Sequence, residues 1–252
     1  MRKTVAALCC AALLSGCVSA ADTGTDVLNT DGFKAAVKDT HAVIVDTRDD
    51  SVYNGFKSEG AARGGHVPEA VQFTTEWLDN IEPDKFESFA ADKGLTKDKT
   101  LVFYDTDASR TEAVGKAFAS RGYKVKVFND FIDYTKDTSN ALESLPEYKY
   151  LVSPTWVKDV LDGKKVETYN GNPVKVFHVA WGDVEQADGY KVHVPDAFHF
   201  NTDWIENGPI WNLSDPSVIL ANLLKQGITK DTTVILYSEN PLAAFRVMWA
   251  LR

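Results

Sequence analysis

Cysteine is nearly absent from this chain of 252 residues. Its three cysteines are Cys9, Cys10 and Cys17, and all of them lie within the first twenty residues. The rest of the sequence can therefore form no disulfide, no Cys-x-x-Cys redox pair and no thiolate metal site. Any chemistry carried by residues beyond Cys17 has to proceed without a thiol.

Positive charge is also scarce. The chain has 27 basic and 36 acidic side chains, for a net charge of −9. The charge becomes −11 if Arg2 and Lys3 are removed with a leader, which leaves 25 basic against 36 acidic residues. This balance disfavours nucleic acid as a partner. Neither GxGxxG nor GxxxxGK[ST] occurs, so we expect no nucleotide and no other cofactor.

The first twenty residues have the features of a targeting segment. A basic start precedes an apolar run from 5 to 14, which suits a secretory signal and is too short to cross a bilayer. Residues 14 to 17 (LSGC) match a bacterial lipobox, although 18 to 20 (VSA) would also serve as an ordinary cleavage site. We predict a lipoprotein signal over 1–20, with the lipid on Cys17. The protein would then lie in the bacterial envelope, in the periplasm, bound to a membrane only through this anchor.

One stretch of sequence appears twice. Residues 66–80 (HVPEAVQFTTEWLDN) and 193–207 (HVPDAFHFNTDWIEN) are identical at eight of fifteen positions. Residues 94–104 and 227–237 are identical at six of eleven. The offset grows from 127 to 133 residues between these pairs, which predicts about six inserted residues near 208–215. The period is too long for a solenoid repeat, so each copy should be a domain.

Strand-like and helix-like segments alternate within each copy. In the first copy, apolar runs at 41–48, 101–105 and 123–128 alternate with helical patterns at 83–93 and 110–121. The second copy has strands at 174–180 and 232–237 and helices at 154–162 and 217–226. This alternation predicts an α/β fold, in which each domain is a mostly parallel sheet with helices on both faces. We place the domains at 25–145 and 150–252, joined by a linker around 140–150.

The second domain is predicted to be incomplete. Arg252 aligns with Ala119 of the first copy, so the counterpart of 120–130 would be missing. We expect a fragment of a longer protein, with several apolar residues of the last helix poorly covered: Val247, Met248, Trp249 and Leu251.

Three motifs of the first copy follow one another in an order typical of one family. They are an Asp-x-Arg strand end at 46–48, a Gly-His-Val-Pro-Glu-Ala turn at 65–70, and a strand followed by a loop that reaches Arg110. They resemble the rhodanese family, whose marks are an Asp-x-Arg strand end, a Gly-His-Ile-Pro-Gly-Ala turn and a Cys-x-x-Gly-x-Arg loop. The resemblance extends over nearly the whole chain after the signal. It implies two tandem rhodanese-like domains, most similar to the first two of a periplasmic three-domain thiosulfate sulfurtransferase.

The resemblance also indicates what is missing. Rhodaneses use a cysteine thiolate that forms a persulfide, held by backbone N–H groups and an arginine. The matching positions are Asp105, five residues before Arg110, and Ser238 in the second copy. A carboxylate cannot form a persulfide, and a hydroxyl without a base is a weak nucleophile. We predict no catalytic residue here, an ion pair between Asp105 and Arg110, and Arg110 as the candidate contact for a small sulfur-containing anion.

The histidines are interpreted as structural. His66 and His193 occupy equivalent turns without partner histidines at ligand spacing, so we predict turn-stabilising roles and no metal site. His178 and His199 should lie in or beside the second core.

Two further pairs receive structural interpretations. Asp46 and Arg48 are expected to form an ion pair that positions the strand-end loop. Trp77 and Trp204, at matching positions, are expected to anchor helices to the two cores.

Three functions remain open at the level of the sequence. The first is the non-catalytic portion of an envelope thiosulfate sulfurtransferase, whose catalytic cysteine lies beyond Arg252. The second is a cysteine-free rhodanese-like lipoprotein that binds an anion, a sulfur species or a protein partner. A phosphatase on the related fold is disfavoured, because it too requires the missing cysteine. We expect the chain to be inactive alone.

Overall fold

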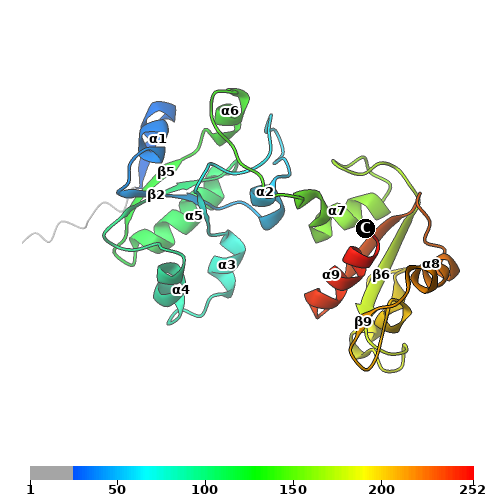
Figure 1. Cartoon of the computed structure of the whole chain (residues 1–252). Helices are drawn as coiled ribbons and strands as arrows, with labels where there is room; N and C mark the ends of the chain where they lie inside the picture. Colours follow the sequence, from blue (N-terminus) through cyan, green and yellow to red (C-terminus); the bar gives the residue numbers. More distant parts are fainter. Residues whose placement is uncertain (1–24) are drawn as a thin grey trace, which may run out of the picture. The chain divides into compact units, whose positions relative to one another are not determined.

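The computed structural model describes residues 25 to 252, so the predicted signal and Cys17 lie outside the described residues. The chain divides into two compact units, the first ending at Tyr148 and the second beginning at Lys149 (Figure 1). A short 3-10 helix, η1 (Tyr148–Tyr150), lies at the division. Each unit has its own sheet and its own apolar core.

The first unit is built on a five-stranded parallel sheet. Its strand order is β1-β5-β4-β2-β3, so the chain crosses over between neighbouring strands. The central strands β2 and β4 are short, apolar and largely buried, as expected for strands covered on both faces. Their bounds are β1 (Asp26–Leu28), β2 (Ala42–Asp46), β3 (Val71–Gln72), β4 (Thr100–Tyr104) and β5 (Lys124–Phe128).

Helices cover both faces of this sheet, as predicted. One face packs an apolar cluster under α3 (Thr75–Asn80), α4 (Phe86–Asp92) and α5 (Ala108–Ala119). The other face packs a second cluster under α1 (Thr30–Val37) and α6 (Phe131–Lys136). Helix α2 (Asp50–Asn54) follows the end of β2.

Local signals explain where these helices begin and end. Asp107 caps α5 by accepting a hydrogen bond from the Ser109 amide at 2.9 Å. Gly94 and Gly122 follow α4 and α5 with φ of 76° and 83°, a conformation that favours glycine. The helix predicted over 83–93 begins later, at Phe86, because the Lys85 amide closes a turn onto the Glu82 carbonyl at 2.9 Å.

The second unit contains a three-stranded parallel sheet among its described residues. The order is β10-β6-β7, and β6 is central. The bounds are β6 (Val174–Ala180), β7 (Phe198–Asn201) and β10 (Thr233–Tyr237). The inserted residues predicted near 208–215 lie in and beside a small antiparallel hairpin, β8 (Glu206–Asn207) and β9 (Asn212–Leu213).

Three α-helices accompany this sheet, and all begin with proline. They are α7 (Pro154–Leu161), α8 (Pro216–Lys225) and α9 (Pro241–Ala250), capped by Ser153, Asp215 and Asn240. Two 3-10 turns, η2 (Asp188–Lys191) and η3 (Thr202–Trp204), precede and follow β7. Among residues 25–252, none of the helices is long and apolar enough to cross a membrane.

The core of the second unit corrects one prediction. Val247 was expected to be poorly covered, but it is fully buried, because it packs against a cluster from β6, β7 and α8 that includes Phe177 and Leu223. Trp249, by contrast, is 62% exposed. Trp77 and Trp204 each pack, partly buried, against the main cluster of their own unit, as predicted.

Candidate functional site

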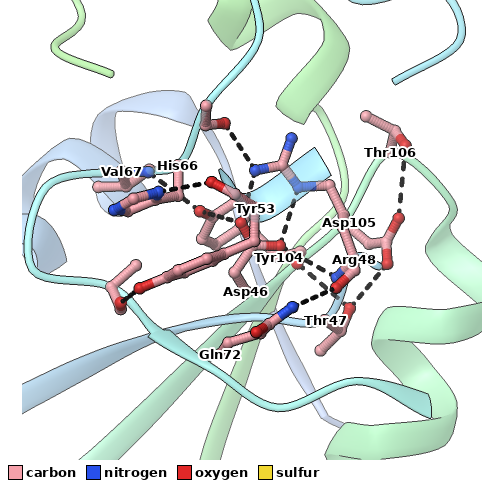
Figure 2. Close-up of polar contacts among 12 residues, drawn as sticks. Asp46, Thr47, Arg48, Tyr53, His66, Val67, Gln72, Tyr104, Asp105 and Thr106 are labelled. Atoms are coloured by element: carbon pink, nitrogen blue, oxygen red, sulfur yellow. Dashed lines mark hydrogen bonds and ion pairs between the residues drawn. The ribbon is translucent and has the colours of Figure 1, made fainter. Parts of the chain in front are cut away.

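The candidate site of the first unit lies at the carboxyl ends of β2 and β4. These strands are parallel neighbours, and Asp46 is paired in register with Tyr104. The residues that follow them therefore emerge side by side, which is where ligands bind in open parallel sheets. Figure 2 shows Arg48, after β2, and Asp105, after β4, within one network of polar contacts.

A buried ion pair forms the centre of this network. The Arg48 guanidinium donates from Nε to Asp46 Oδ1 at 2.8 Å and from Nη2 to Asp46 Oδ2 at 2.5 Å. Nη2 also donates to the Gly65 carbonyl at 2.8 Å, and the guanidinium lies 4.6 Å from the Phe131 ring centroid. This confirms the predicted ion pair between Asp46 and Arg48, and Arg48 also contacts the loop that contains Gly65. Arg48 is 1% exposed, and its burial could not be predicted from the sequence.

The Tyr104 hydroxyl makes a second contact with the same loop. It donates to Asp46 Oδ2 at 2.6 Å and accepts a hydrogen bond from the Val67 amide at 3.0 Å. Burial, reinforced by the Asp46 carboxylate, raises the pKa of Tyr104 well above its ordinary value. Burial alone would lower the pKa of Arg48, but the contact with Asp46 outweighs it and the pKa is raised, so Arg48 stays charged.

Asp105 is fully buried at the end of β4. Its carboxylate accepts hydrogen bonds from Thr47 Oγ1 at 2.9 Å and from the Asp107 amide at 3.0 Å. Arg110 Nε lies 3.8 Å from Asp105 Oδ2, an ion pair without a direct hydrogen bond. Burial is the main cause of a raised pKa at Asp105, opposed by the Asp107 amide, Arg110 and Thr47. The Asp105 carboxylate thus accepts the hydrogen bonds that the donors at this strand end can make.

Arg110 shares its charge among three carboxylates. Besides Asp105, its guanidinium lies 3.7 Å from Asp107 and 3.5 Å from Asp49. Its side chain is 36% exposed, so part of it faces solvent. The predicted pairing with Asp105 is therefore present but loose. An anion approaching Arg110 would meet these carboxylates as well.

The duplicated turn has the same contacts in both units. In the first, His66 Nδ1 lies 2.7 Å from the Tyr53 carbonyl, and the two rings stack at 4.0 Å. In the second, His193 Nδ1 lies 2.6 Å from the Tyr190 carbonyl, with the rings at 4.1 Å. The contact of the Val67 amide with Tyr104 is also repeated, by Val194 and Tyr237 at 3.0 Å. These histidines stabilise turns, as the sequence predicted.

Comparison with known proteins identifies the first unit. A model of the rhodanese-like domain matches residues 29–134, which contain the whole strand-end network described above. The first unit is a rhodanese-like domain.

The proteins that this chain resembles are longer, and it spans about half of their length. It is 30% identical over 205 residues to "Thiosulfate sulfurtransferase YnjE" of Escherichia coli (strain K12), a match that covers 81% of this chain and 45% of YnjE. An anaerobic ergothioneine biosynthesis enzyme from Chlorobium limicola, solved with trimethyl histidine, is similar with a TM-score of 0.83 at 26% identity. That match covers 90% of this chain and 56% of the enzyme. A complex of EanB with hercynine gives a TM-score of 0.79 at 27% identity, over 86% and 49% of the two chains.

The strand end of the second unit carries different groups from the rhodanese-like domain. His178, paired in register with Tyr237, is fully buried and takes the place of Asp46. Its Nε2 lies 2.7 Å from Glu239 Oε2, a contact that the sequence pattern missed because Glu239 lies in a loop after the neighbouring strand. Glu239 has a lowered pKa, caused mainly by this hydrogen bond. His199, paired in register with His178, is also buried, so both histidines lie in the core as predicted.

Ser238 follows β10 directly. Its hydroxyl accepts a hydrogen bond from the Asn240 amide at 3.1 Å, which forms a turn leading into α9. His178 directs its Nε2 to Glu239, and the described contacts give Ser238 no histidine base. Within residues 25–252, no group of three or more His, Cys, Asp or Glu side chains is placed to hold a metal ion.

Proposed function

We propose that this chain is the non-catalytic portion of an envelope thiosulfate sulfurtransferase. The persulfide-forming cysteine would belong to a part of the protein beyond Arg252. The two rhodanese-type units of this chain would serve as the scaffold that accompanies the catalytic domain. A small sulfur-containing anion is the expected substrate of the whole protein.

The observation that carries the proposal is the state of Asp105. Sulfur transfer in this family needs a thiolate nucleophile held by N–H donors and a nearby positive charge. In the first unit, those contacts are made by the Thr47 hydroxyl, the Asp107 amide and Arg110, and they are made to a carboxylate. Asp105 can accept hydrogen bonds from these groups, but it cannot carry a sulfane sulfur.

The lengths of the relatives support the second part of the proposal. The chain spans less than half of YnjE, which is named as a thiosulfate sulfurtransferase, and about half of the solved relatives. Every residue between 18 and 252 is something other than cysteine. A protein of this family that transfers sulfur would then need its thiol elsewhere.

The envelope location rests on the leader. The basic start, the apolar run at 5–14 and the lipobox ending at Cys17 favour export and acylation. Replacing Cys17 with serine should release the protein from the membrane fraction. Unchanged fractionation of Cys17→Ser would reject the lipid anchor and leave the sulfurtransferase proposal untouched.

The activity is tested by cyanolysis. Residues 18–252, which contain no cysteine, should form no thiocyanate above the uncatalysed rate when incubated with thiosulfate and cyanide, and intact-mass analysis should find no mass gain of one sulfur atom. Turnover by this chain would contradict the proposal directly.

A second measurement separates the proposal from its alternative, a cysteine-free binding module. The mature protein isolated from its source cells should have a mass well above that of residues 18–252, and should transfer sulfur until its additional cysteine is alkylated. A native mass that matches residues 18–252 would favour the binding module.

A further inference from the structure

An open cleft of about 790 Å³ lies at the strand ends of the second unit. Ala180 and Ser238, at the ends of β6 and β10, line it. Residues of the β8–β9 hairpin and of the first turns of α9 line it as well. The cleft thus occupies the same topological position as the Asp105 site of the first unit, but it is not filled by a buried carboxylate.

Two indole rings line this cleft and remain substantially exposed. Trp181 follows β6 and is 57% exposed, and Trp211 lies in the hairpin and is 47% exposed. Burying the large apolar faces of exposed indoles is favourable. Because both indoles line the same cleft, they suit a ligand with an apolar surface.

The hairpin holds Trp211 in an unfavourable backbone conformation. Its φ is +53°, which bulky residues rarely adopt. The Trp211 carbonyl accepts a hydrogen bond from Arg246 Nη2 at 2.9 Å, which fixes this conformation from α9. Strain that the surrounding structure maintains is commonly found at ligand sites. Here it sets the position of an indole that contributes little to the core.

The charges of the cleft leave a carboxylate in excess. Arg246 is the one basic side chain among the described residues that line the cleft, and its Nε donates to Glu206 at 3.2 Å. Glu239 also lines the cleft, and its partner is the buried His178. Its carboxylate lies against Gly189, where any Cβ would come within 2.0 Å of Oε1, so the absence of a side chain there makes room for it. Glu239 is thus held in place and remains negative.

We infer that this cleft binds a small organic cation, such as a quaternary ammonium or a protonated amine with an apolar body. The faces of the two indoles attract a cation through their quadrupoles, and Glu239 supplies the opposite charge. A neutral ligand of the same shape would gain only the apolar contact. An anion would be repelled by Glu239, because Arg246 is already neutralised by Glu206. The inference does not depend on sulfur transfer.

The test follows the indole N–H signals of the full chain by NMR during titration with choline. The chain has six tryptophans, which can be assigned with single variants. Choline should produce saturable shifts at Trp181 and Trp211 and none at Trp249, an exposed indole of the same unit that does not line the cleft. The neutral isostere 3,3-dimethyl-1-butanol should bind about fivefold more weakly or worse, within the range expected for a cation held by aromatic faces. Thiosulfate should produce no saturable shift.

Variants make the result specific. Trp181→Ala and Glu239→Gln should each weaken choline binding about fivefold or more, and Trp249→Ala should leave it unchanged. Glu239→Gln should not alter the affinity for the neutral isostere. Equal affinities for choline and its isostere, saturable shifts with thiosulfate, or shifts at Trp249 equal to those at Trp181 would each overturn the inference. Glu239→Gln could disturb the buried His178, which Glu239 contacts. Trp181 is on the surface, so Trp181→Ala tests the site without that disturbance.

Discussion

In each unit, a tyrosine at the end of a strand binds the backbone of the His-Val-Pro turn, at equivalent positions in the two sequences. The charged groups around these two tyrosines differ. In the first unit, Tyr104 contacts Asp46, which is paired with the buried Arg48. In the second, Tyr237 lies beside His178, whose partner Glu239 is largely exposed. The contact between tyrosine and backbone amide is 3.0 Å in both. The comparison shows that the frame of a strand-end site can persist while its charged groups change completely.

The largest expected effect is in the first unit, from removing one member of its buried ion pair. Arg48→Met leaves the Asp46 carboxylate buried without its partner, which should destabilise the unit by about 3–5 kcal/mol. Urea unfolding followed by hydrogen exchange and mass spectrometry reports the two units separately. The loss should be confined to peptides of the first unit, and adding Asp46→Asn to Arg48→Met should recover part of it. A loss below about 1 kcal/mol would mean that the pair contributes little to the frame.

A second pair of variants compares equivalent positions in the two cores. Phe118 of α5 is fully buried among aromatic rings, with centroids 4.8 Å and 4.9 Å from Phe86 and Phe73. Leu251, its counterpart in the alignment of the two copies, is only partly buried. Phe118→Ala should cost about 3–5 kcal/mol. Leu251→Ala should cost about 1 kcal/mol, because part of its surface is already in water. Equal losses, measured by the same unfolding experiment, would mean that the two cores are packed equally well.

Helix caps should behave alike in the two units. Asp107 and Asn240 accept hydrogen bonds from the amides of Ser109 and Leu242, at equivalent places before α5 and α9. Alanine at either position should cost about 1 kcal/mol. A serine variant at each site should retain most of the stability. A clear difference between the two losses would show that the common frame differs at this turn.

The smallest expected effects are on the pH dependence of the free energy of unfolding. The contribution of Asp105 in the first unit and that of Glu239 in the second should have opposite signs. The pKa of Asp105 is raised by burial, so its charge costs stability at neutral pH, and this cost disappears as pH falls through the folded-state pKa. The pKa of Glu239 is lowered, so its charge adds stability above the unfolded pKa, and this gain is lost as pH falls through the folded-state pKa. Glu239 is largely exposed, so its effect should be small.

The variants Asp105→Asn and Glu239→Gln, which replace each carboxylate with an amide, measure the sign of each contribution. As pH falls from about 7 to about 4.5, the native chain should gain stability relative to Asp105→Asn in the first unit. Below about pH 4.5, it should lose stability relative to Glu239→Gln in the second unit. Equilibrium unfolding at a series of pH values, read separately for each unit, gives both differences. Two differences of the same sign would contradict the assigned environments.

The central strands and the repeated turn of both units could be predicted from the sequence. The side-chain contacts between neighbouring strand ends could not. The pattern of apolar residues and the turn-forming residues between them predicted the strands at 101–105 and 174–180. The repeated His-Val-Pro turn predicted a duplicated fold. The position of Asp105 also followed from the family pattern. The pattern did not reveal that Glu239 meets His178, or that Arg48 is buried. Those contacts depend on which strands become neighbours and on loop conformations, and neither is encoded in the spacing of apolar residues along one strand.

The tyrosine hydroxyl that holds the His-Val-Pro turn has a structural consequence. Tyr104 and Tyr237 each accept a hydrogen bond from a backbone amide. This hydrogen bond does not require particular side chains in the turn or on the facing strand. An acid and an imidazole can therefore occupy equivalent positions on the facing strand without releasing the loop. Such a contact allows the two strand ends to carry different charged groups while the turn stays attached.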